Sequence, residues 1–128
     1  MMRLSAQLIS YTLKLYNNNM EEYRIVWDED KNTVNKRKHG ISFETARFVF
    51  ADSNRLERLD QSEGNTSGEE RWQTLGMAEG VLFVVYAENK TEGMNETRLI
   101  TARLANKTER RSYNGHYRID SRGWSKAD

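Results

Sequence analysis

The feature that most constrains the fold is a series of four short, strand-like segments joined by short polar connections. They are Arg55–Asp60, Arg71–Met77, Val81–Tyr86 and Thr97–Leu104. Val81–Tyr86 (VLFVVY) is the most apolar of them, and its short separation from the preceding segment suits a hairpin. Successive strands with short loops pair as an antiparallel meander. We therefore expect one antiparallel sheet with Val81–Tyr86 at its centre and Arg55–Asp60 at an edge.

Helix signals stand on both sides of this series. Asp28 can cap a helix that ends at Gly40, supported mainly by Val34 and Ile41. Ser42 can cap a second helix, whose three phenylalanines we assign to the core. A third helix follows Asn106, because Asn106 and Glu109 have the spacing of a capping box. With a first strand at Tyr23–Trp27, the predicted fold class is α+β, with a small antiparallel β-sheet, two helices before the meander and one after it, all on one face.

The chain divides into a central domain and two flanking segments. Residues 1–22 form an N-terminal extension, in which the spacing of Leu4, Leu8, Tyr11 and Leu15 predicts a helix. Met20 is an alternative start of translation. Residues 23–113 form the domain, and residues 114–128 form a polar tail that we expect to be disordered apart from what Tyr117, Ile119 and Trp124 can dock.

Composition excludes several classes of site. The sequence has no cysteine and two histidines, so we expect no disulfide, no metal site and no cofactor. Twenty basic and 19 acidic residues leave a net charge of +1, so any binding of nucleic acid requires local clusters of basic residues. The longest apolar run is far shorter than the roughly 20 residues that span a bilayer. We expect no membrane contact and a cytoplasmic protein.

The basic residues gather in two places. Thr97–Tyr113 joins a strand that carries Arg98 and Arg103 to a helix start that carries more arginines. Unpaired guanidinium groups are costly to bury, so these two should face a groove. Simple alternation puts them on opposite faces of one strand, and a bulge is needed to bring them together. The second cluster, Lys36–His39, closes the first helix, where it also suits the helix dipole.

Three blocks, RIVWDEDKNTVNKRKHGISFETARFVF, GEERWQTLG and TRLITARLANKTERRSY, together resemble the BrnT toxins of bacterial type II toxin–antitoxin systems. The resemblance covers about Tyr23 to Tyr113. It implies a RelE-like fold, RNA cleavage that arrests translation and growth, and neutralisation by a BrnA-type antitoxin. Contact with operator DNA is implied only through that antitoxin. The chain departs from the family pattern at Thr45 and Thr101, where acidic residues and serine are common.

Metal-independent RNA cleavage requires groups that hold the phosphate and groups that move protons. Arginine holds phosphate more rigidly than lysine. The residues predicted to be catalytic are Arg71, Arg98, Arg103, His39 and Glu70, and those predicted to bind RNA are Lys38, Arg110 and Tyr113. Glu109 is a further candidate for proton transfer beside His39 and Glu70.

Each assignment has a structural alternative. The arginines can pair with Glu69, Glu70, Glu96 or Glu109, and Glu109 can act as a helix cap. The main functional alternative is a non-catalytic module that binds RNA or a partner protein without cleaving it. A third hypothesis is an interaction module for the antitoxin that has lost toxicity.

Overall fold

The computed structural model describes residues 8–16, 22–62, 68–91, 94–115 and 120–127; for residues 8–14, 91 and 94 it describes the backbone only. The strands in these ranges are β1 (Leu8–Tyr16), β2 (Glu22–Asp28), β3 (Leu56–Leu59), β4 (Trp72–Met77), β5 (Val81–Thr91), β6 (Met94–Leu104) and β7 (Ser125–Lys126). The helices are α1 (Glu29–His39), α2 (Phe43–Ala46), the 3₁₀ helix η1 (Arg47–Ala51) and α3 (Lys107–Asn114). None of the described helices is long and apolar enough to span a membrane.

The strands form one sheet in the order β1-β2-β6-β5-β4-β3-β7. The predicted meander is confirmed, since β3, β4, β5 and β6 pair antiparallel in succession and β5 is central. The prediction of a wholly antiparallel sheet is wrong, because β2 pairs parallel to β6. Such a pair needs a long crossover, which the chain between β2 and β6 supplies.

The helix predicted for the N-terminal segment is wrong where the structure describes it. Residues 8–16 form β1, which pairs antiparallel with β2. The sequence also has apolar residues at every second position from Ile9 to Leu15, which is the period of a strand. Pairing with β2 decides between the two periods.

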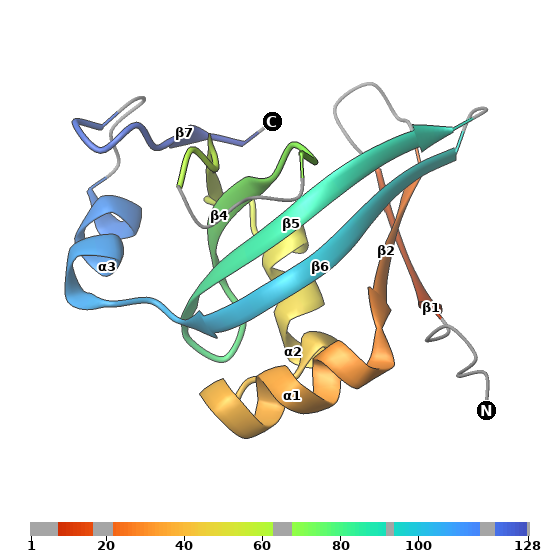
Figure 1. Cartoon of the computed structure of the whole chain (residues 1–128). Helices are drawn as coiled ribbons and strands as arrows, with labels where there is room; N and C mark the ends of the chain where they lie inside the picture. Colours follow the sequence, from red (N-terminus) through yellow and green to blue (C-terminus); the bar gives the residue numbers. More distant parts are fainter. Residues whose placement is uncertain (1–7, 17–21, 63–67, 92–93, 116–119, 128) are drawn as a thin grey trace.

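The long hairpin of β5 and β6 dominates the molecule (Figure 1). Both strands are longer than the predicted segments, because β5 continues past Tyr86 to Thr91 and β6 begins at Met94, before Thr97. The strand at Arg55–Asp60 is not at the edge, because β7 pairs with β3. Trp124, one of the three tail residues expected to dock, is buried and anchors the tail, whereas Tyr117 and Ile119 lie outside the described residues.

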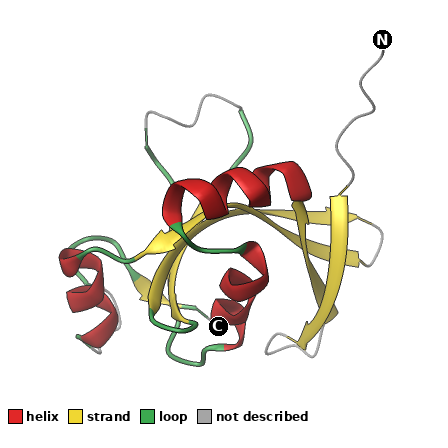
Figure 2. Ribbon diagram, turned by 90° about the horizontal axis from the view of Figure 1, so that it is seen from below, coloured by secondary structure: helices red, strands yellow, loops and turns green. Residues whose placement is uncertain are grey.

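The sheet curls around α2 and η1 (Figure 2). On this inner face, Trp27, Phe43 and Leu99 belong to one core cluster. On the outer face, Phe83, Leu75 and Trp124 form a second, smaller cluster, against which Tyr113 of α3 packs. The expectation that all helices cover one face is therefore wrong for α3, because the linker at Ala105 carries the chain round to the outer face.

Helix α1 has the predicted bounds, with Asp28 as its N-cap and Gly40 in the left-handed conformation that ends it. Its predicted apolar support is wrong in part, because Val34 is 58% exposed. Two buried asparagines hold it instead. Asn35 donates to the Ala102 carbonyl at 2.8 Å and accepts from the Ala102 amide at 3.0 Å. These bonds give the backbone groups of Ala102 partners at a position of β6 where its pairing with β2 has ended. Asn32 accepts from the Phe43 amide at 2.8 Å.

The second helix begins at its Ser42 cap as predicted, but α-helical geometry ends at Ala46 and η1 follows. Phe43 and Phe50 are buried, whereas Phe48 is exposed beside the guanidinium of Arg47, so its assignment to the core is wrong. Helix η1 lies close against β4 at Gly76. A side chain there would place its Cβ 2.7 Å from Val49 Cβ, which makes this glycine necessary.

Candidate functional site: an arginine row on the outer face

A bulge in β6 brings the two strand arginines to the same face. Thr101 pairs with Val85 and Leu99 with Tyr86, so Ile100 is the extra residue. Arg98 therefore lies opposite Ala87, and Arg103 opposite Phe83. Positions four residues apart on β5 share a face, and Phe83 belongs to the outer cluster. The required bulge is present, and Arg98 and Arg103 both project from the outer face, roughly 13 Å apart along the strand.

Arg71 completes a row across three strands. It directly precedes β4 and its Trp72–Tyr86 pair, which places it beside Ala87, on the side of β5 away from Arg98 of β6. Neighbouring strands are about 4.8 Å apart, so Arg71 and Arg98 flank the small Ala87 side chain at roughly 10 Å. Arg71 Nε is buried and has no hydrogen-bond acceptor in the part of the chain that the structure describes. We call Arg71, Ala87 and Arg98 the arginine row.

The carboxylate at the arginine row is Glu69. Its Oε1 lies 2.5 Å from Arg98 Nη2. Glu70, the predicted catalytic residue, is exposed, and its charge acts on Glu88 of the inner face. The structure therefore brings Glu69, which the sequence suggested only as an ion-pair partner, to Arg98. Glu69 and Glu70 are adjacent in the chain, yet their charges act on groups of opposite faces of the sheet.

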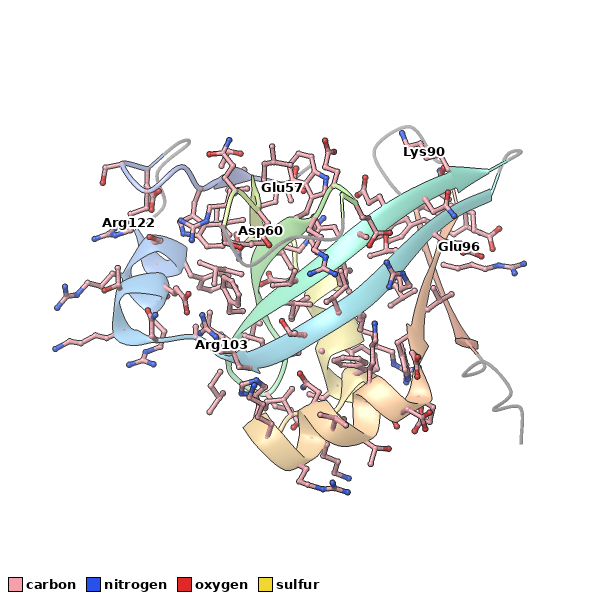
Figure 3. The ribbon with its side chains drawn as sticks, viewed as in Figure 1. Glu57, Asp60, Lys90, Glu96, Arg103 and Arg122 are labelled. Carbon is pink, nitrogen blue, oxygen red and sulfur yellow. The ribbon has the colours of Figure 1, made fainter. Side chains whose placement is uncertain are left out.

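Arg103 has a different environment from Arg98. Its guanidinium lies 4.1 Å from the centre of the Phe83 ring and forms two hydrogen bonds, at 2.8 and 2.9 Å, with the Glu109 carboxylate. Glu109 also closes the capping box of α3, since Oε1 accepts from the Asn106 amide. Burial raises the pKa of Glu109, but the hydrogen bonds from Arg103 and Asn106 and the nearby positive charges outweigh it, so the pKa is lowered overall. Figure 3 shows Arg103 at the end of β6 next to α3.

Two further arginines that the sequence did not single out lie on the outer face. Arg58 of β3 stacks 4.0 Å from the centre of the Trp124 ring and donates to Gln73 at 2.7 Å. Arg24 of β2 is on the same face as Val26, two residues along the strand, and Val26 pairs with Arg98. Neither could be found without the pairing of β2 with β6 and the docking of the tail. Basic side chains from β2, β3 and β6, together with Arg71 just before β4, thus share this face.

The remaining predicted residues are dispersed. Lys38 and His39 lie in the last turn of α1, which packs on the inner face through Asn35. Arg110 donates to the Ala105 carbonyl at 2.8 Å. Tyr113 donates its hydroxyl to Asp52, and burial, this hydrogen bond and the Asp52 charge raise its pKa to about 12. The structure therefore groups Arg71, Arg98 and Arg103 on one face and does not bring His39, Lys38 or Glu70 to them.

The chemistry available at the arginine row follows from these contacts. Two guanidinium groups on the two sides of β5 can hold one phosphate in a fixed geometry, and Glu69 offers an oxygen that accepts a proton. In the described part of the chain, no group of three or more histidines, aspartates or glutamates is placed to bind a metal ion.

Comparison with known proteins identifies the family of the chain. No curated protein matches the chain. The family model described as "Ribonuclease toxin, BrnT, of type II toxin-antitoxin system" matches residues 27–109, which is more than half of the 128 residues. The match contains β3 to β6, the arginine row and Glu109. The chain therefore belongs to the BrnT family of ribonuclease toxins of type II toxin–antitoxin systems, whose members act with an antitoxin partner.

Proposed function

We propose that this chain cleaves RNA without a metal ion, at the arginine row, and thereby arrests translation and growth until a BrnA-type antitoxin binds it. The observation that carries the proposal is the placement of Arg71 and Arg98 on either side of Ala87, with Glu69 against Arg98. The family assignment supplies the reaction class, and the outer face supplies the groups that the reaction needs.

The small side chain of Ala87 supports a phosphate site between the two arginines. Larger residues stand at the neighbouring outer positions of β5, Phe83 and Val85. Arg71 Nε is buried and lacks an acceptor, and a phosphate oxygen would provide one. Arg103 is a weaker candidate for this role, because two of its nitrogens already bind Glu109.

The proposed reaction uses the RNA's own 2′-hydroxyl as the nucleophile. Glu69 accepts the 2′-hydroxyl proton, the 2′ oxygen forms a bond to phosphorus, and the bond from phosphorus to the 5′ oxygen breaks. The 5′ oxygen leaves as a hydroxyl with a proton from water, the resulting hydroxide takes the proton back from Glu69, and the other product ends in a 2′,3′-cyclic phosphate. Arg71 and Arg98 stabilise the additional negative charge on the phosphate oxygens in the transition state. Glu69 must release Arg98 when the phosphate binds.

The test is cleavage of a single-stranded RNA by the purified chain in EDTA, followed by identification of the new ends. We expect cleavage to be unaffected by EDTA and to give 2′,3′-cyclic phosphates. Activity that disappears in EDTA and returns with magnesium would contradict the mechanism. An RNA that changes mobility on a gel but stays intact with excess protein would favour the non-catalytic binding module.

A further inference from the structure

A groove lies away from the arginine row, near the far end of the β5–β6 hairpin. Its volume is about 500 Å³, and it lies between the end of the hairpin and the segment from η1 to β3. This volume is within the range of sites that bind a small ligand or a short peptide segment. Figure 3 shows Lys90 and Glu96, two of the lining residues, at the opposite end of the hairpin from Arg103. The groove is therefore separate from the site proposed above.

The charges of this groove are mostly negative. Asp52, Glu57, Glu88 and Glu96 line it, against the two cations Arg55 and Lys90. Arg55 is already engaged, since it pairs with Glu57 at 3.6 Å, donates to Thr74 at 3.2 Å and stacks 5.0 Å from the centre of the Phe50 ring. The groove therefore repels the phosphates of RNA and favours a positively charged occupant.

Glu88 and Glu96 are the lining carboxylates that are left for such an occupant, because neither has a hydrogen bond or ion pair among the described residues. Glu57, by contrast, accepts from the Tyr86 hydroxyl at 3.2 Å and pairs with Arg55. We choose Glu88 because the charge of Glu57 acts on it within the groove. Desolvation by the walls and the neighbouring Glu57 charge raise the pKa of Glu88, and they outweigh the charges of Lys90 and Arg55, which lower it. A cation beside Glu88 would relieve this repulsion.

The walls of the groove suit the stem of a long basic side chain. Tyr23 and Phe50 belong to or pack against the inner core, and Tyr16 is 56% exposed at the rim. Aromatic rings of this kind pack against the methylene groups of lysine and arginine and attract their charged ends. The groove thus combines a carboxylate without a partner, aromatic walls and enough volume for more than one side chain.

We infer that this groove is a docking site for the antitoxin, and that it receives a segment carrying a lysine or arginine whose charged group pairs with Glu88. The family assignment provides the protein partner, and charge complementarity selects the kind of segment that binds here. The inference does not depend on where RNA is cleaved. It places antitoxin binding on the inner face, opposite the arginine row.

The experiment measures binding of the antitoxin from the same operon to the full chain by titration calorimetry. We expect Glu88→Lys to weaken binding by about tenfold or more, because it replaces the attraction with a repulsion, and Glu88→Gln to weaken it less. Glu79→Lys is the matched control, since Glu79 is exposed in the turn between β4 and β5 and carries the same charge change. It should leave the dissociation constant unchanged.

A second arm identifies the partner residue. Each lysine and arginine of the antitoxin is changed to glutamate, and at least one of these changes should restore binding to the Glu88→Lys chain. Equal weakening by Glu88→Lys and Glu79→Lys, or unchanged binding by a folded Glu88→Gln chain, would overturn the inference. RNA cleavage by the free Glu88→Lys chain should equal that of the wild type. If the proposed ribonuclease mechanism is wrong, the wild type itself fails in the RNA cleavage assay, and antitoxin binding is unaffected.

Discussion

The outer and inner faces of this sheet carry opposite kinds of charge from neighbouring positions of the same strands. On β5, Ala87 lies in the arginine row, and the next residue, Glu88, lines the acidic groove. On the chain before β4, Glu69 meets Arg98, and Glu70 acts on Glu88. Alternation in a strand separates groups one residue apart by the thickness of the sheet. One small sheet can therefore keep a site for phosphate apart from a surface for a cationic partner.

The largest expected effect is on catalysis at the outer face. Replacing either Arg71 or Arg98 by alanine should reduce kcat for RNA cleavage by roughly 10²- to 10³-fold, the cost typical of losing one donor to transition-state charge. The fold reduction of kcat in the double variant should be smaller than the product of the two single reductions, because both side chains hold one phosphate. Single-turnover cleavage rates provide the measurement, with the exposed Arg37→Ala of α1 as the control. Strictly multiplicative losses would indicate two separate phosphate sites.

The two adjacent glutamates should differ sharply. Glu69→Gln should lower kcat by about 10²-fold, because an amide cannot accept the 2′-hydroxyl proton, whereas binding of RNA should not weaken, because Arg98 loses its counterion. Glu70→Gln should leave kcat within about twofold of the wild type. Comparing kcat with the dissociation constant of a substrate that lacks the reactive 2′-hydroxyl separates the two effects. An equal loss of kcat in both variants would contradict the assignment of Glu69 to the outer face and Glu70 to the inner face.

Stability of the inner face depends on an asparagine. Asn35→Ala should lower the free energy of unfolding by at least about 2 kcal/mol, because it leaves the amide and carbonyl of Ala102 without partners. Val34→Ala, one residue away and exposed, should change it by less than about 0.5 kcal/mol. Urea denaturation followed by circular dichroism measures both. A similar small change in the two variants would show that α1 is held by other contacts.

The smallest predicted effect concerns Glu109 and pH. Its pKa is lower in the folded chain than the ordinary value of about 4.3, so its ionised form stabilises the fold. This contribution is fully present above that ordinary value and is lost as pH falls through the folded pKa. The free energy of unfolding of the wild type should therefore exceed that of Glu109→Gln by about 1 kcal/mol at pH 7, and this difference should shrink towards pH 3. A difference that is constant with pH would contradict the ion pair with Arg103.

Much of the fold followed from periodicity and capping residues. The meander, the caps at Asp28 and Ser42, and the box of Asn106 with Glu109 are local patterns, and they are confirmed. The strand at residues 8–16 and the parallel pair of β2 with β6 depend on contacts between distant segments, which no local pattern specifies. The support of α1 by asparagines was missed for a related reason, since a polar residue shows its role only when its hydrogen-bond partners are known.

For the candidate site, the sequence indicated the arginines and the need for a bulge to bring Arg98 and Arg103 to the same face. Arg98 and Arg103 could share a face only through a bulge, and the bulge is at Ile100. The sequence could not show that Glu69, and not the predicted Glu70, lies next to Arg98, because this depends on the direction of the chain before β4. The grouping of Lys38 and His39 with the arginines remains a prediction that the packing of α1 does not favour.

The most direct test of the account compares one substitution on each face in the same assay. The rate of RNA cleavage in EDTA is measured for the wild type, Arg98→Ala and Glu88→Lys at equal concentration of folded protein. We predict that Arg98→Ala loses at least about 10²-fold in rate and that Glu88→Lys cleaves as the wild type does. Loss of cleavage in Glu88→Lys with full activity in Arg98→Ala would place the chemistry in the inner groove and contradict the account.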